Sequence, residues 1–222
     1  RWQLRAGLIA YDLLAGGRGI ERHRWLSRDE VIEAEPVLAA PDLRGAFRYV
    51  DAQMDDARLC VENALDASAH GARIETRTEV MDLIVDEGAV RGVRVRADER
   101  ELDVEAPIVV NCAGPWYDRV ASSQSLTRPV RVRLSRGTHV VVPPITRGNA
   151  LLLAAEDRRV FFVLPFKGKS LIGTTDLDHD GTADSVEPTE EEIDYLLRSV
   201  NTHLRDRQLK RDDVLHAFAG VR

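Results

Sequence analysis

Two stretches of alternating apolar and polar residues constrain the fold most strongly. The first, 78–105, contains TEVMDLIVD, AVRGVRVRA and RELDVE, with a turn at Glu87-Gly88 between the first two segments. Alternation with a period of two is typical of half-buried strands, so this stretch predicts an antiparallel meander. The second stretch, from about 130 to 176, contains four apolar segments separated by tight turns, and it predicts a second antiparallel sheet.

The segment PIVVNCAGPW has a different pattern. Its apolar run Ile108–Val110 is unbroken, which is typical of a parallel strand covered on both faces. Gly114 then breaks the run, and Pro115 is suited to the first position of a helix over 116–121. A strand that leads into a helix in this way borders the crevice where open α/β sheets bind nucleotides. A βα turn without a ligand is the alternative.

Capping signals predict the helices. Ser27 and Glu30 form one potential capping box, and Thr189 and Glu192 form another. The predicted helices cover 2–15, 26–36, 56–69 and 189–204.

The chain therefore belongs to the mixed α/β (α+β) class, and we expect three segments in its 222 residues. Residues 1–52 contain helices and a strand, 53–122 a helix, the meander and the parallel strand, and 123–222 the antiparallel sheet with a packed helix. The chain is 44% hydrophobic and 31% charged, as is ordinary for a soluble globular protein. Its formal charge of −6 argues against nucleic acid as a partner.

Two features raise the question of metal binding. Cys60 and Cys112 lie far apart in apolar segments, which predicts buried, reduced thiols rather than a disulfide or a metal site. The alternating aspartates of 176–181 resemble the start of a calcium loop, but a predicted strand precedes them where an EF-hand has a helix. We therefore predict no metal site.

Two residues are candidates for catalysis or substrate binding. His139 lies in the middle of a long predicted strand, just after a break at Arg136-Gly137 where the sheet can bend over a pocket. A strand histidine is usually a core residue, but histidine is also the side chain best suited to move a proton near neutral pH. Arg222 follows the strand end FAGV, and its guanidinium is suited to hold a phosphate or a carboxylate with two hydrogen bonds.

Six segments, in this order, resemble the FAD-dependent glycerol-3-phosphate dehydrogenases, a branch of the D-amino-acid-oxidase-like flavoenzymes. They are DAQMDDARL, VVNCAGPWYDRV, LSRGTHVVVP, LIGTTD, EEIDYLLRSVN and FAGVR, and the resemblance covers about 45–222. It implies that 53–122 is the later part of a Rossmann-like FAD domain. It also implies that 123–222 is a substrate domain built on an antiparallel sheet.

The resemblance also implies a set of cofactor-binding residues. Val80 would lie near the adenine, and Ala113, Gly114 and Trp116 near the phosphates or the flavin. The family's GxGxxG fingerprint is not found, since AGGRG at 15–19 follows a predicted helix rather than a strand. We therefore expect an internal fragment that binds FAD weakly or not at all by itself.

For the substrate, the resemblance matches His139 to a histidine that lines the family's active site, as a candidate proton acceptor or orienting group. Arg222 matches an arginine that engages glycerol 3-phosphate, and Thr174 and Asp176 would support the pocket floor.

The implied reaction is oxidation of sn-glycerol 3-phosphate to dihydroxyacetone phosphate, a step of glycerol metabolism, with a quinone as the electron acceptor. The implied location is cytoplasmic, with peripheral membrane contact through other segments. The alternatives are a related flavin oxidase of amino acids or hydroxy acids, and a folded fragment without catalytic activity.

Overall fold

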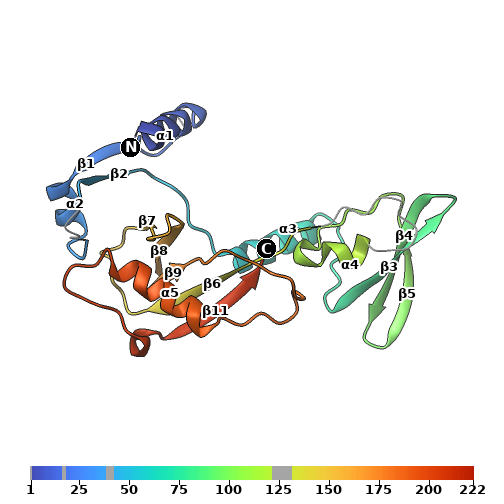
Figure 1. Ribbon diagram of the computed structural model, residues 1–222. Coiled ribbons are helices and arrows are strands. Elements are labelled where there is room, and N and C mark those ends of the chain that lie inside the picture. The colour runs from blue at the N-terminus through green and yellow to red at the C-terminus, as the bar shows by residue number, and fades with distance from the viewer. Residues whose placement is uncertain (1, 17–18, 39–42, 122–131) are drawn as a thin grey trace. The chain divides into compact units, whose positions relative to one another are not determined.

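The computed structural model describes residues 2–16, 19–38, 43–121 and 132–222 (Figure 1). The chain divides into two compact units, each assembled from segments that are separate in the sequence. The first unit contains 1–52, 136–177 and 186–220, and the second contains 53–135, 178–185 and 221–222.

Most strands of the first unit lie in one six-stranded sheet. Its order is β10-β6-β9-β8-β7, and β11 pairs with β6. The pairs β6–β9, β9–β8 and β8–β7 are antiparallel, which confirms the prediction of an antiparallel sheet. The strands are β6 (Ser135–Val142), β7 (Leu151–Ala154), β8 (Val160–Phe166), β9 (Lys169–Gly173), β10 (Leu177–Asp178) and β11 (His216–Val221).

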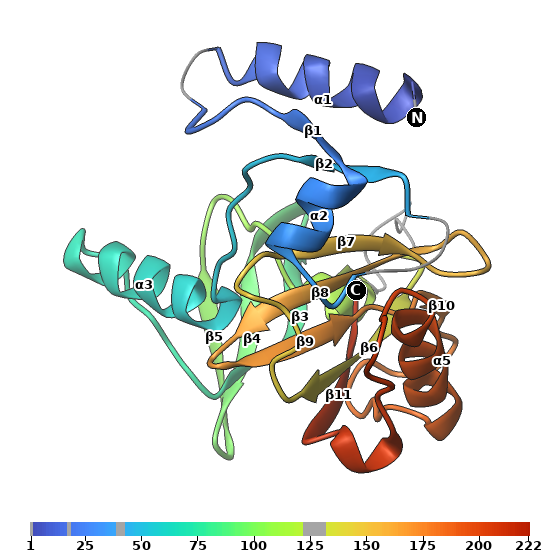
Figure 2. The ribbon, with the colours of Figure 1, turned by 90° about the vertical axis from the view of Figure 1, so that its left-hand side faces the viewer.

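Helix α5 (Glu190–Asn201) covers one face of this sheet (Figure 2). It begins at the predicted capping box, in which Thr189 and Glu192 bond each other's backbone N–H groups. The stripe of α5 that faces the sheet is buried, and each of its large side chains contributes about 1.5–3 kcal/mol of transfer free energy. The stripe contains Ile193, Leu196, Leu197 and Val200, and it packs in one core with Val140, Val142, Phe161, Val163 and Ile172.

The N-terminal part of the first unit has its own small core. Helix α1 (Trp2–Leu14) precedes strand β1 (Arg24–Ser27), which pairs antiparallel with β2 (Gly45–Arg48). The sequence did not indicate β1. The capping box of Ser27 and Glu30 is confirmed, and it starts helix α2 (Arg28–Ala34). Leu26 of β1 and Val31 of α2 are buried together with Leu38, which follows α2.

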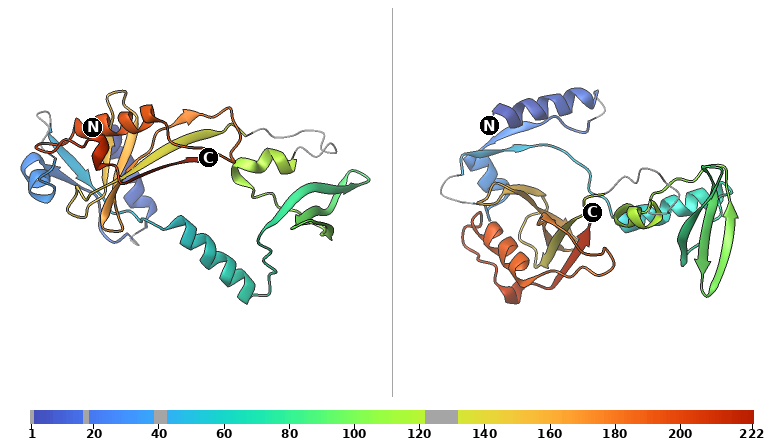
Figure 3. Two further views of the ribbon diagram at one scale, coloured as in Figure 1. Left: turned by 90° about the horizontal axis from the view of Figure 1, so that it is seen from below. Right: turned by 45° about the vertical axis from the view of Figure 1, so that its right-hand side comes forward.

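The second unit contains the predicted meander, whose strands β3 (Thr78–Asp86), β4 (Ala89–Ala97) and β5 (Arg100–Glu105) pair in that order (Figure 3). Helix α3 (Asp56–Ala69) begins at Asp55, whose side chain accepts a hydrogen bond from the backbone N–H of Arg58. A 3-10 turn, η1 (Gly114–Trp116), leads into helix α4 (Tyr117–Ala121).

One predicted strand is absent from the structure. Residues 108–112 contain no strand, and Ile108 and Val110 are 77% and 75% exposed. A parallel strand forms only beside a neighbour that accepts its slanted hydrogen bonds, and no strand in the described ranges pairs with this run. The prediction of a parallel strand at this position is therefore wrong for the structure.

The prediction of buried thiols is also wrong. Cys60, on α3, and Cys112, just before η1, are free and exposed. Both were expected to be buried because their neighbours are apolar, but no residue of α3 is buried. Among the helices that the structure describes, none is both long enough and apolar enough to cross a membrane.

Candidate active site

His139 belongs to an inner strand of the sheet in the first unit. It lies on β6 directly opposite Gly173 of β9. Its imidazole stacks on the ring of Phe218 from β11, with ring centroids 5.2 Å apart and an interplanar angle of 11°. A Cβ on Gly173 would collide with the imidazole, so the ring lies over the backbone of β9. The position of the His139 ring therefore requires a residue without a side chain at position 173.

The residues that follow β9 are held by hydrogen bonds to β6. Thr175 is 3% exposed, and its hydroxyl accepts a 2.8 Å hydrogen bond from the backbone N–H of Thr138. Thr174 donates to the carbonyl of Thr175 at 2.8 Å, and the peptide bond between Gly173 and Thr174 is cis. A Cβ on Gly137 would collide with the Thr174 hydroxyl. Two glycines on adjacent strands thus allow this segment to lie close against β6.

Glu192 connects the same segment to helix α5. Its carboxylate is 4% exposed and accepts the hydroxyl proton of Thr175 at 2.9 Å, the backbone N–H of Thr189 at 3.0 Å and a guanidinium N–H of Arg136. Burial by itself would raise the pKa of Glu192, but the hydrogen bonds from Thr189, Thr175 and Arg136 outweigh it and lower the pKa. From the sequence, Glu192 is identified only as part of a helix capping box.

The aspartates after this segment are engaged by arginines. The backbone carbonyl of Asp176 accepts a 3.2 Å hydrogen bond from Arg159, and the carboxylate of Asp178 binds Arg133 through both oxygens, at 2.5 and 2.6 Å. Within the described ranges, no group of three or more histidine, cysteine or acidic side chains is arranged to hold a metal ion. The residues that resemble a calcium loop follow a strand here rather than a helix.

In the second unit, the turn Ala113–Trp116 has a defined conformation. The side chain of Asn111 accepts the backbone N–H of Ala113 at 3.0 Å and donates to the carbonyl of Tyr117 at 3.1 Å. Gly114 has a φ of +53°, which favours glycine, and the side where its Cβ would stand is open. The turn therefore presents bare backbone at Gly114, and Asn111 is a supporting residue that the sequence did not reveal.

The indole of Trp116 is anchored by a residue far along the chain. Its Nε1–H donates a 2.8 Å hydrogen bond to Asp184, whose other oxygen pairs with Arg119. The hydrogen bond from Trp116, followed by the one from Arg119, lowers the pKa of the Asp184 carboxyl. Asp184 is 68 residues from Trp116, so no local pattern indicated this contact.

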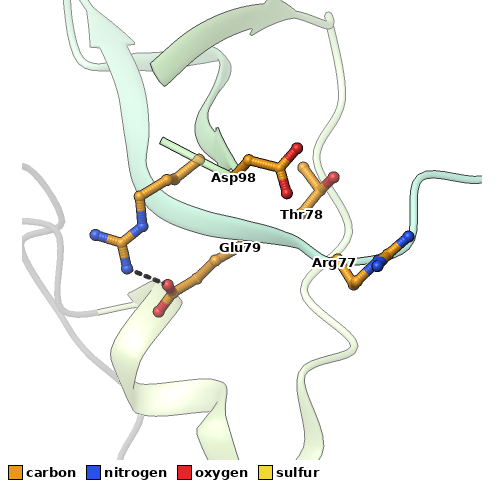
Figure 4. Close-up of a pocket in the computed structure, with 5 residues that line it drawn as sticks. Arg77, Thr78, Glu79 and Asp98 are labelled. Atoms are coloured by element: carbon orange, nitrogen blue, oxygen red, sulfur yellow. Dashed lines mark hydrogen bonds and ion pairs between the residues drawn. The ribbon is translucent and has the colours of Figure 1, made fainter. Parts of the chain in front are cut away.

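Val80 lies in β3 opposite Val95 of β4. The two residues before it, Thr78 and Glu79, line an open pocket of about 460 Å³. Figure 4 shows Glu79 paired with the guanidinium of a neighbouring arginine, at 2.5 Å. The full lining is Arg77, Thr78, Glu79, Arg96 and Asp98, so both signs of charge face the pocket.

Arg222 follows β11 and exchanges two backbone hydrogen bonds of 2.8 Å with Ser135. The structure thus gathers the candidate residues in two sets. His139, Thr174 and Asp176 belong to the first unit. The second unit contains Val80, Ala113, Gly114, Trp116 and Arg222.

The chain is similar to known proteins along its whole length. The family of FAD dependent oxidoreductases matches residues 2–222. The D-erythritol 1-phosphate dehydrogenase of Brucella abortus is 40% identical over 225 residues, covering all of this chain and 44% of that protein. A glycerol-3-phosphate dehydrogenase of Pseudomonas aeruginosa is 38% identical, over all of this chain and 43% of that protein.

A solved structure agrees with these relatives. The crystal structure of the glycerol-3-phosphate dehydrogenase from Bacillus halodurans, complexed with FAD, superposes with a TM-score of 0.81 at 33% identity. The match covers 89% of this chain and 41% of that protein. The chain therefore spans less than half the length of these relatives.

Proposed function

The chain belongs to the FAD-dependent oxidoreductase family, and on that premise we propose that it forms part of an enzyme that oxidises sn-glycerol 3-phosphate to dihydroxyacetone phosphate. One observation carries the proposal: the similarity in sequence and fold to the FAD complex of a glycerol-3-phosphate dehydrogenase, at a TM-score of 0.81. The Pseudomonas relative is also named a glycerol-3-phosphate dehydrogenase, and its match covers the whole of this chain.

The second unit suits a bound FAD. Gly114 is left-handed and leaves open space where a side chain would stand, so a ligand can approach its backbone. We assign Ala113, Gly114 and Trp116 to the phosphates or the flavin, and Val80 to the adenine side, next to an open pocket. When bound, FAD supplies the acceptor for a hydride from C2 of the substrate.

We assign the proton of the substrate hydroxyl and the negative charge of the substrate phosphate to residues of this chain. We assign His139 to accept or orient the proton of the C2 hydroxyl, because its ring is held by Gly173 and Phe218 without being fully buried. We assign Arg222 to the substrate anion, since a guanidinium binds phosphate oxygens in pairs. Thr174 and Asp176 belong to the pocket floor in this proposal, and the buried hydroxyl of Thr175 fixes that floor to β6.

A second substrate has a specific observation in its favour. The Brucella relative, at 40% identity, is named for D-erythritol 1-phosphate. That molecule is also a linear polyol monophosphate with secondary hydroxyl groups, so the same proton acceptor and the same anion clamp would serve it. The two candidates differ in chain length rather than in chemistry.

Electron transfer to a quinone, a role in glycerol metabolism and a cytoplasmic location with peripheral membrane contact complete the proposal. They rest on the resemblance to glycerol-3-phosphate dehydrogenases.

The test uses the complete protein that contains this chain, loaded with FAD and kept free of oxygen. Glycerol 3-phosphate or D-erythritol 1-phosphate should bleach the flavin absorbance, and glycerol without phosphate should not, because Arg222 needs an anion. Bleaching by D-amino acids or sarcosine, with none by the polyol phosphates, would overturn the proposal in favour of an amine oxidase. A complete protein that takes up no FAD would also overturn the proposal, in favour of a protein without flavin catalysis.

A further inference from the structure

The sheet face opposite α5 carries a row of residues that crosses five strands. Residues directly opposite each other on paired antiparallel strands point to the same face. The pairs Leu152–Phe162, Phe162–Gly173 and Gly173–His139 are opposite each other, and His139 stacks on Phe218. We call Leu152, Phe162, Gly173, His139 and Phe218 the aromatic row.

Side chains that alternate with this row face the core. Phe161 and Ile172, one position from Phe162 and Gly173, are buried under α5 at 1% and 0% exposure. Phe162 itself is 42% exposed and Phe218 is 39% exposed. The aromatic row therefore remains open to a ligand while the opposite face is packed.

Gly173 makes the row asymmetric around His139. Gly173 has no side chain, so the imidazole of His139 can lie over the backbone of β9. A Cβ on Gly173 would meet the ring atoms Cδ2, Cγ and Nε2. The next strand, β8, lies about 5 Å further across the sheet, and there Phe162 stands opposite Gly173. Along the row, the His139 imidazole therefore has Phe218 on one side. On its other side, beyond Gly173, the next side chain is Phe162.

We propose that Phe162 is a specificity-determining residue, which walls the space beside the His139 imidazole and limits the length of the polyol chain that reaches it. The inference rests on the proposed function, since it takes His139 as the group that meets the reacting hydroxyl. The exposed ring of Phe162 offers an apolar surface to the C–H edge of a polyol. Its bulk determines how many carbons fit beside the carbon that is oxidised.

The proposal is tested by comparing kcat/KM for the two proposed substrates. D-erythritol 1-phosphate has one more CHOH group than glycerol 3-phosphate, and one added or missing methylene-sized group in a pocket changes kcat/KM by about 10–200-fold. Phe162→Leu shortens the wall, so we expect the kcat/KM ratio of the longer to the shorter substrate to rise about tenfold. Phe162→Trp lengthens the wall and should lower the ratio.

The control variant is Val160→Ala. Val160 lies on the same strand and the same face, is 53% exposed, and stands opposite Ala154 rather than Gly173. It should leave the ratio unchanged. Dissociation constants for both substrates, measured by calorimetry on the complete enzyme with its flavin already reduced, should follow the kcat/KM ratios without turnover.

The outcomes separate the two claims. If the wild-type enzyme oxidises neither polyol phosphate, the proposed function fails. If the wild type oxidises them but both Phe162 variants keep the wild-type ratio, or change both substrates equally, this inference alone is overturned. A ratio that rises in Phe162→Leu, falls in Phe162→Trp and stays constant in Val160→Ala supports it.

Discussion

Replacing Thr175 by valine tests the bonded network that holds the segment after β9. Valine has nearly the shape of threonine, so the apolar contacts at this 3% exposed position remain while the hydroxyl is lost. Two hydrogen bonds disappear: the one accepted from the N–H of Thr138 at 2.8 Å and the one donated to Glu192 at 2.9 Å.

The expected loss of stability follows from the two groups left behind. Thr138 is 0% exposed, and a buried N–H without an acceptor costs about 1–3 kcal/mol. The carboxylate of Glu192 loses one of several donors, and a hydrogen bond to a charged group contributes about 1.5–3 kcal/mol. Because one hydroxyl serves both contacts, the two values do not add fully, and we expect a total of about 3 kcal/mol.

Urea unfolding of the full chain, followed by circular dichroism, measures the loss as a lower midpoint with an unchanged m-value. Hydrogen exchange of the Thr138 amide reports on the same bond locally and should become faster. Thr175→Ser is the matched control, since it keeps the hydroxyl and removes one methyl group, at about 1 kcal/mol. A Thr175→Val variant that unfolds like the wild type and keeps the Thr138 amide protected would show that the Thr175 hydroxyl does not stabilise this segment.

Three further predictions concern Glu192, Gly173 and Asp184. Because folding lowers the pKa of Glu192, its ionised form contributes stability that is fully present above its ordinary value of 4.5 and is lost as pH falls through the folded pKa. Glu192→Gln should therefore flatten the acid side of a stability–pH curve, and an unchanged curve would contradict the pKa shift. Gly173→Ala should displace the imidazole of His139 and cost about 1–3 kcal/mol, visible as a lower thermal midpoint and altered histidine NMR shifts. Asp184→Ala should change the fluorescence and the indole N–H shift of Trp116, whereas Asp184→Asn, which keeps an acceptor, should change them less.

Local patterns predicted the elements whose determinants lie within a few residues of each other. Both capping boxes were found because Ser27–Glu30 and Thr189–Glu192 are three residues apart. The meander was found because its strands alternate and its turns are short.

The elements that depend on distant partners were mispredicted or missed. The apolar run at 108–112 was predicted as a strand, but a strand needs a neighbour, and none in the described ranges pairs with it. Strand β1 was missed because its partner β2 begins 21 residues after it starts, so four residues of weak pattern were the only local signal. Burial of Cys60 and Cys112 was inferred from apolar neighbours, which do not determine which face of an element is covered.

The candidate site shows the same division. His139 and the segment after β9 stood out in the sequence, and the structure places His139 and Gly173 opposite each other. The positions of the supporting groups did not follow from the sequence. Glu192 reaches Thr175 across 17 residues and Arg136 across 56, and such contacts exist only once the sheet and helix have packed.

The identity of the oxidation product shows directly which reaction the complete enzyme catalyses. The complete enzyme, loaded with FAD and supplied with an artificial electron acceptor, is incubated with sn-glycerol 3-phosphate, and the product is identified by mass spectrometry. We expect dihydroxyacetone phosphate, with less of it formed when His139 is replaced by alanine. Unchanged glycerol 3-phosphate, alongside an oxidised amino acid in a parallel incubation, would contradict this expectation.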